Sequence, residues 1–184
     1  MAIFNNKFLV LLILLFIMFI SRGGHFINLI NFPDASLIIF LSLGFLSFDL
    51  VIFSLFFIFA AAIDFGLAIF NPQLGFCLTN GYWGLIPTYM VMFFFGRFIN
   101  KNNLMNDSFK LITVGALSIS LAFIISTNTY YMFSGRFGNP TLLDSFFHGW
   151  KYYPEYILPN LVYLLIFALA CKVKNHPLFL VKFK

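Results

Sequence analysis

The chain has 184 residues, of which 61% are hydrophobic and 9% are charged, and its formal net charge is +5. Soluble domains carry about 25% charged residues, so a water-soluble fold of this length would be unable to bury so much apolar surface. The 11 Lys and Arg residues are scattered and form no basic stripe of the kind that lines a nucleic-acid groove. The composition therefore predicts an integral membrane protein that lies in a lipid bilayer and binds no nucleic acid.

Apolar segments recur along the chain and predict an all-α fold of six transmembrane helices in a single domain, residues 1–184. We expect these helices at residues 8–21, 35–47, 50–70, 82–99, 109–128 and 153–171. The stretch 35–70 is too long for one span, so it is divided at the polar interruption Ser47-Phe48-Asp49. The resulting second helix is short for a bilayer. Asp34 lies just before this helix and is expected to cap its N-terminus.

The distribution of positive charge predicts how these helices are oriented. With six spans and a cytoplasmic N-terminus, eight of the 11 basic residues fall inside and the other three fall outside. The inner residues are Lys7, Arg97, Lys101, Lys110, Lys172, Lys174, Lys182 and Lys184, and the outer residues are Arg22, Arg136 and Lys151. A five-span topology would move one basic end outside, which the positive-inside rule disfavours. Both termini are therefore expected in the cytoplasm, and the connections 22–34, 71–81 and 129–152 are expected to face outward.

The two cysteines are expected on opposite sides of the membrane. Cys77 lies in the second outer connection, whereas Cys171 closes the last helix at the inner side. A disulfide requires Cα atoms within roughly 7 Å, so the two thiols are not expected to pair. Cys77 is either a buried loop thiol or a ligand for a soft metal centre. One cysteine cannot build a metal cage by itself, so the other ligands would come with the metal, as they do in a corrin or a haem.

Other polar and aromatic residues near the outer side allow both a structural and a functional interpretation. Asp64 lies within the third predicted helix, where a carboxylate either holds the loops through hydrogen bonds or contacts a ligand. His25 follows two glycines in the first outer connection and is a candidate ligand contact. Tyr82 and Tyr131 suit an interfacial aromatic belt, and they also suit packing against a flat apolar ligand. Arg136 would either meet a phosphate or carboxamide or cap a loop.

Several motifs of membrane enzymes and pumps are missing from the sequence. It has no Walker A loop, so the chain is not expected to hydrolyse ATP. It has no H-E-x-x-H motif and no Arg-rich voltage-sensing segment. The two halves also lack a clear inverted repeat of broken helices, which argues against a secondary transporter built in that way.

The outer segments resemble one known family. The residues that carry the resemblance are Ser21-Arg22-Gly23-Gly24-His25-Phe26, Phe32-Pro33-Asp34-Ala35-Ser36, Ala62-Ile63-Asp64, Phe76-Cys77, Tyr82, Phe133-Ser134-Gly135-Arg136-Phe137 and Asn139-Pro140-Thr141. In this order they resemble the BtuM-type cobalamin transporters, which are similar to the substrate-binding S components of energy-coupling-factor transporters. The resemblance extends from about Arg22 to the last helix, and it is specific in the outer connections rather than in the apolar spans.

The resemblance implies a bacterial inner-membrane protein with six helices that binds cobalamin from the outer side. It implies that Cys77 is the axial ligand to the corrin cobalt, and that His25, Asp64 and Tyr82 are further contacts. It also links Cys77 to removal of the upper cyanide ligand of cyanocobalamin. Docking S components tend to carry Ala-x-x-x-Ala in their first helix, whereas residues 8–20 here contain neither Ala nor Gly. This difference agrees with a protein that works without an energising module.

Three functional interpretations therefore remain open from the sequence, beside a membrane scaffold that binds no small ligand. The first is a cobalamin transporter in which the Cys77 thiolate binds cobalt and weakens the bond to the opposite ligand. The second is a membrane enzyme whose main task is decyanation of corrinoids. The third is an S component for a different vitamin or metal, in which Cys77 has a structural role.

Overall fold

The computed structural model describes residues 2–23, 33–71, 75, 78–138 and 140–174, and every regular element among them is helical. The α-helices are α1 (Ala2–Gly23), α2 (Ser36–Phe45), α3 (Leu50–Phe70), α4 (Leu85–Lys101), α5 (Ser108–Phe133), α6 (Leu142–Gly149) and α7 (Tyr153–Lys174). Short 3-10 helices lie between them, including η2 (Asn80–Gly84), η3 (Leu104–Asn106) and η4 (Trp150–Tyr152). His25 and Cys77, two of the expected site residues, lie outside the described residues.

Within the described residues, three helical segments are long and apolar enough to cross a membrane: Leu50–Phe70, Ser108–Phe133 and Leu142–Cys171. The last segment runs through α6, η4 and most of α7. Large apolar side chains are exposed on their outer faces, for example Ile58 on α3 and Leu117 on α5. Contiguous apolar surface of this kind is unfavourable in water and suits contact with lipid. The chain is therefore an all-helical protein with surfaces expected of a membrane protein.

The helix boundaries agree with the sequence expectation to within two residues for α2 and α3 and less closely elsewhere, since α1 begins at Ala2 rather than at residue 8. Helix α3 covers Leu50–Phe70, the same residues that were expected for the third helix. The fourth expected helix begins as the 3-10 turn η2, because α4 itself starts only at Leu85. Residues 129–152 were expected to form an outer loop, and this expectation was wrong in part. Helix α5 continues to Phe133, and the segment also contains the whole of α6.

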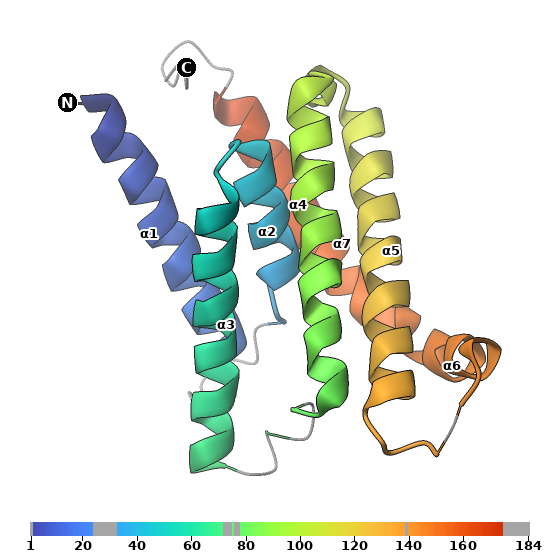
Figure 1. The fold of residues 1–184 in the computed structure, drawn as a ribbon. Helices are drawn as coiled ribbons and strands as arrows, with labels where there is room; N and C mark the ends of the chain where they lie inside the picture. The colour runs from blue at the N-terminus through green and yellow to red at the C-terminus, as the bar shows by residue number, and fades with distance from the viewer. Residues whose placement is uncertain (1, 24–32, 72–74, 76–77, 139, 175–184) are drawn as a thin grey trace.

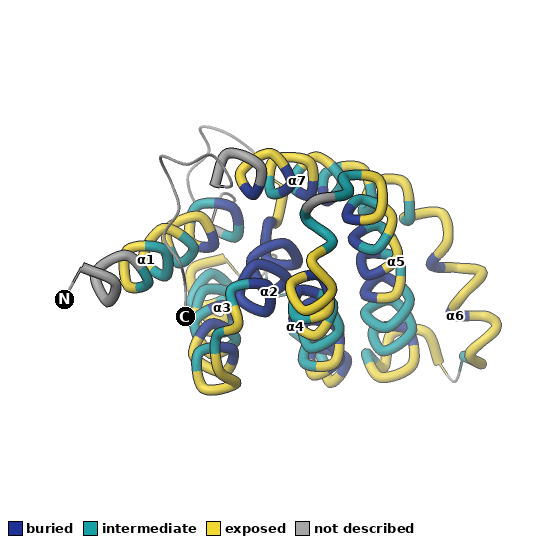
Figure 2. Tube along the Cα trace, turned by 90° about the horizontal axis from the view of Figure 1, so that it is seen from above, coloured by how far each residue is buried: buried dark blue, intermediate teal, exposed yellow. Residues whose placement is uncertain are grey.

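Helix α2 is the centre of the bundle. All of its 10 residues are buried, and Figure 2 shows it enclosed by α1, α3, α4 and α7. A helix of this length spans roughly 15 Å, about half the hydrocarbon thickness of a bilayer. Its contact with α4 is close because Gly96 lies against the Leu41 carbonyl and Gly44 lies against the Phe93 carbonyl, where a Cβ atom would overlap the oxygen. Small residues thus let the two backbones approach.

The arrangement of the helices brings polar residues together at one end of the bundle. Helices α1, α3 and α5 run toward that end, whereas α2, α4 and α7 begin there (Figure 1). Helix α6 projects sideways at the same end, and the start of α1 and the end of α7 lie at the opposite end (Figure 1). Consequently the last turns of three helices and the first turns of three others surround one region.

Candidate ligand-binding site

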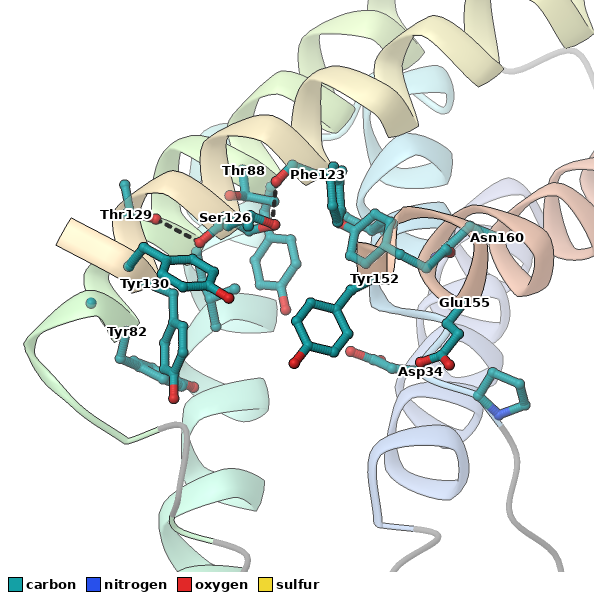
Figure 3. A pocket seen from close by; sticks show the side chains of 18 of the residues that line it. Asp34, Tyr82, Thr88, Phe123, Ser126, Thr129, Tyr130, Tyr152, Glu155 and Asn160 are labelled. Atoms are coloured by element: carbon teal, nitrogen blue, oxygen red, sulfur yellow. Dashed lines mark hydrogen bonds between the residues drawn. The ribbon is translucent and has the colours of Figure 1, made fainter. Parts of the chain in front are cut away.

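A cavity of about 920 Å³ opens at the end of the bundle where α1, α3 and α5 finish. Residues from each of the helices α1 to α7 line it, and α6 contributes His148. Ten of the lining residues are labelled in Figure 3. Small-molecule pockets commonly measure about 300–1,000 Å³, so this cavity lies near the upper end of that range. Its size favours a large ligand.

Aromatic side chains form much of the cavity wall. Tyr131 and Phe137 lie with ring centroids 4.2 Å apart, and Tyr130 lies 5.9 Å from Phe137. On the other side, Phe123 of α5 and Tyr156 of α7 have centroids 5.1 Å apart. Tyrosine combines a flat apolar ring with a hydroxyl at its edge. The wall therefore offers apolar faces to a flat ligand and polar groups to its rim.

The polar floor of the cavity is organised by an ion pair between α1 and α3. Arg22 Nε donates to Asp64 Oδ1 at 2.7 Å, and Arg22 Nη2 donates to Asp64 Oδ2 at 2.8 Å. The two side chains are only 10% and 20% exposed. Two parallel bonds between a guanidinium and a carboxylate are stronger and more specific in geometry than a single contact. This pairing also satisfies a carboxylate that would be costly to leave alone within a membrane helix.

The third arm of Arg22 extends the same network to α2 and α4. Its Nη1 donates to Ser36 Oγ and to Tyr89 Oη, both at 2.7 Å, and lies 3.4 Å from Asp34 Oδ2. Asp34 Oδ1 in turn accepts from the Ser36 backbone N–H at 2.9 Å. The N-cap residue of α2 is Ala35, so the expectation that Asp34 occupies that position was wrong by one residue. One guanidinium thus joins four helices beside the cavity.

Tyr82 connects this network to the segment that precedes α4. Its hydroxyl donates to Asp64 Oδ2 at 2.9 Å, and its ring packs edge-on against Phe65 with centroids 5.7 Å apart. The adjoining glycines hold this segment against α5. A Cβ on Gly81 would lie 2.9 Å from the Tyr130 Cα, and a Cβ on Gly84 would overlap Thr129. These close contacts could not be predicted from the sequence.

The amphipathic helix α6 closes one side of the cavity. Its N-terminus carries a capping box in which Thr141 Oγ1 accepts from the Asp144 N–H at 3.2 Å, and Asp144 Oδ2 accepts from the Thr141 N–H at 3.1 Å. At its other end, His148 lines the cavity, and its Nδ1 lies 2.8 Å from the Asp144 carbonyl oxygen. Gly149 packs against Thr127 of α5, which holds α6 to the bundle.

The expected site residues fall into three groups. Asp64, Tyr82 and Tyr131 all line the cavity. Arg136 is exposed between α5 and α6, where its backbone N–H donates to Ser134 Oγ at 3.3 Å, and it does not line the cavity. The other two expected contacts, Cys77 and His25, lie outside the described residues, so their roles stay predictions.

Several cavity residues were not identified from the sequence. Arg22 is the most important of them, because it organises the floor, although it was interpreted only as an outer-loop charge. Tyr89, Tyr156 and Asn160 also line the cavity from positions that looked like ordinary apolar-helix residues. One available signal was the pair formed by Arg22 and Asp64, since opposite charges near the same membrane face tend to pair.

Potential metal ligands and similarity to other proteins add little to this picture. Within the part of the chain that the structure describes, no three His, Cys, Asp or Glu side chains gather to hold a metal ion. A metal brought by a macrocycle would need only one protein ligand. In comparisons with known proteins, no family model matched the sequence and no curated protein matched it. The resemblance to cobalamin transporters therefore rests on the residues of the outer segments alone.

Proposed function

We propose that the chain takes up cobalamin across the bacterial inner membrane and binds the corrinoid from the outer side. In this proposal six helices cross the membrane, both termini lie in the cytoplasm, and Cys77 is the axial cobalt ligand. The observation that carries the proposal is the cavity of about 920 Å³, which is large, walled by aromatic rings and floored by polar groups. Asp64, Tyr82 and Tyr131, all expected near the corrinoid, line this one cavity.

The chain on either side of Cys77 supports a position near this cavity. Gly75 lies so close to Ala68 of α3 that a Cβ on it would approach the Ala68 Cβ at 3.0 Å. Ala68 is one helical turn beyond Asp64. Tyr82, five residues after Cys77, lines the cavity itself. The described residues on either side of Cys77 therefore lie at the end of the bundle where the cavity opens.

The distribution of charge supports the proposed orientation. Arg97, Lys101 and Lys110 lie at the end of the bundle opposite the cavity, where α4 finishes and α5 begins. The start of α1 and the end of α7 lie at that end too (Figure 1). If that end faces the cytoplasm, the positive-inside rule is met and the cavity opens outward.

The proposed chemistry at cobalt is a ligand exchange. The corrin supplies four nitrogen ligands, and the Cys77 thiolate takes the lower axial position. A thiolate is a strong electron donor, so it weakens the bond on the opposite side of the metal. Cyanide then leaves as an anion with its bonding electron pair, and water takes its place without a change in the oxidation state of cobalt. Decyanation is thus a consequence of binding rather than a separate activity.

Growth of a cobalamin-requiring strain tests the transport proposal. The strain lacks other cobalamin uptake proteins and receives either cyanocobalamin or the already decyanated hydroxocobalamin at limiting concentration. We expect the wild-type protein to support growth on both. Growth on neither, despite normal amounts of protein in the membrane, would contradict transport. A different result would favour a decyanating enzyme. In that case the protein would not support growth on hydroxocobalamin, but the purified protein would convert cyanocobalamin.

A further inference from the structure

Helix α7 carries a polar feature at the cavity wall that is separate from the Arg22 network. Asn160 lines the cavity and is only 6% exposed (Figure 3). Its Nδ2 donates to the Tyr156 carbonyl at 2.8 Å. Its Oδ1 is buried, and no donor among the described residues meets it. Because a buried acceptor without a donor is unfavourable, this oxygen is unusual in a helix of a membrane protein.

Proline at the preceding position adds a second acceptor to the same stretch of α7. Pro159 lies inside the helix and has no backbone N–H, so it cannot donate to the carbonyl of Glu155 four residues earlier. Both Glu155 and Pro159 line the cavity. The first turns of α7 therefore contain the Glu155 carbonyl, to which the Pro159 nitrogen cannot donate, and the Asn160 side-chain oxygen, which no described donor meets.

Asn128 Oδ1 of α5 is also buried without a donor among the described residues, but Asn128 does not line the cavity. Buried serine and threonine hydroxyl groups in the bundle behave differently from these two amides. Ser118 of α5 is fully buried, and its hydroxyl donates to the Gly115 carbonyl at 2.7 Å. Thr88 of α4 is 1% exposed and donates to the Gly84 carbonyl at 2.7 Å. A hydroxyl can satisfy itself on its own helix in this way. The amide of Asn160 donates to its own helix, whereas its oxygen meets no donor among the described residues.

We propose that Asn160 is a specificity-determining residue whose side-chain oxygen accepts a hydrogen bond from a primary amide or hydroxyl group of the bound ligand. The oxygen is covered by protein atoms, so contact with a ligand requires the side chain to turn about its own bonds. This inference rests on the proposed function, because the rim of a corrin ring carries primary carboxamides, whose NH₂ groups are donors. A carboxylate at the same point has no donor and would be repelled by the Asn160 oxygen.

Binding of cyanocobalamin to the purified full-length protein in detergent tests this inference. Leucine has nearly the shape of asparagine and lacks its oxygen, so Asn160→Leu removes the acceptor without a large change in volume. We expect this variant to bind cyanocobalamin about ten-fold more weakly. Cyanocobalamin derivatives with one carboxamide hydrolysed to a carboxylate add a second readout. The wild type should discriminate against the derivative altered at the contacted amide, and Asn160→Leu should lose that discrimination.

Ser118→Ala serves as the matched control, because it also removes a buried polar group from the bundle but one that is already bonded and does not line the cavity. It should bind cyanocobalamin like the wild type. The thermal midpoint without ligand separates a binding role from a structural one. Asn160→Leu should be at least as stable as the wild type, since an unmet acceptor is removed.

The outcomes distinguish this inference from the proposed function. Equal binding by the wild type and Asn160→Leu would overturn the specificity role, and so would a lowered midpoint of the ligand-free variant, which marks a structural residue. A wild type that binds no cyanocobalamin would overturn the proposed function. Because the inference rests on that function, it would fall with it, whereas measurable and equal binding by both proteins would overturn the inference alone.

Discussion

Arg22 and Asp64 form a two-bond ion pair that joins the end of α1 to α3, with donor–acceptor distances of 2.7 and 2.8 Å. The same guanidinium reaches α2 and α4 through Ser36 and Tyr89. Because the pair is mostly hidden from solvent, each partner depends on the other to offset the loss of hydration. The cavity floor is therefore a structural junction as well as a candidate ligand contact.

Removal of one partner of this pair should destabilise the bundle. Asp64→Ala leaves the Arg22 guanidinium buried without its carboxylate, which typically costs about 3–5 kcal/mol. Unfolding in mixed micelles titrated with SDS measures the loss. Asp49→Ala is the matched control, because Asp49 lies exposed at the other end of α3 and its side chain makes no capping bond. If Asp64→Ala and Asp49→Ala unfolded at the same SDS fraction, the junction would have no structural role.

Tyr82→Phe tests the hydrogen bond to Asp64 without removing the ring. The ring contact with Phe65 remains, whereas the 2.9 Å bond from the hydroxyl is lost. Hydrogen bonds to charged groups contribute about 1.5–3 kcal/mol, so the free energy of unfolding should decrease by about that amount. Tyr152→Phe, on an exposed tyrosine at the cavity, should change it by much less. A variant as stable as wild type would show that the bond is replaced by water.

The glycine contact between α2 and α4 should tolerate no side chain. In Gly96→Ala the new methyl group overlaps the Leu41 carbonyl, so the helices must separate, with an expected loss of about 1–3 kcal/mol. Gly66→Ala on α3 is the control, since nothing lies within 4 Å of a Cβ there. Alanine is the better helix former, so Gly66→Ala should stabilise slightly. The same SDS titration compares the two, and equal stability would contradict the close α2–α4 packing.

The start of α5 should respond to acid through Asp107. The hydrogen bond from the Lys110 backbone N–H is the largest cause that lowers the pKa of this carboxyl below its ordinary value of 3.8, and the hydrogen bond from the Lys110 side chain is the second. A lowered folded-state pKa gives stability that is present above the ordinary value and is lost as the pH falls through the folded value. Asp107→Asn can still cap the helix but cannot titrate, so the acid-dependent loss below pH 3.8 should be smaller in this variant. An identical pH profile would contradict the assignment.

The sequence was sufficient for features that depend on local pattern. Apolar runs located α3 at Leu50–Phe70 and showed that the helix after Asp34 would be short. It was insufficient for α6, because Leu142–Gly149 is only 8 residues long and follows a turn-rich segment. The capping box at Thr141 and Asp144 was the local signal for this helix, and it was not used.

Features of the site that depend on contacts between distant segments could not be derived in the same way. Asp64 was found because a carboxylate inside an apolar helix is unusual by itself. Arg22 was not assigned a role, because its partners are 14, 42 and 67 residues away in the chain. Asn160 was also missed, since its unmet oxygen becomes visible only when its surroundings are known.

Labelling of Cys77 tests the orientation of the protein. In a Cys171→Ala background Cys77 is the single thiol, because the chain has two cysteines. A membrane-impermeant maleimide added to intact spheroplasts should label it, and cyanocobalamin should protect it. Labelling that requires permeabilised membranes would place the segment in the cytoplasm and contradict the proposed topology.

The absorption spectrum of protein purified after growth with cyanocobalamin tests the central proposal most directly. The wild type should carry a corrinoid spectrum that is shifted from that of unbound cyanocobalamin, because a thiolate replaces the lower ligand of cobalt. Cys77→Ala should lose the corrinoid or return it to the unbound form, whereas Cys171→Ala should keep the shifted spectrum. A colourless wild type, or a spectrum that Cys77→Ala leaves unchanged, would contradict cobalt binding through this cysteine.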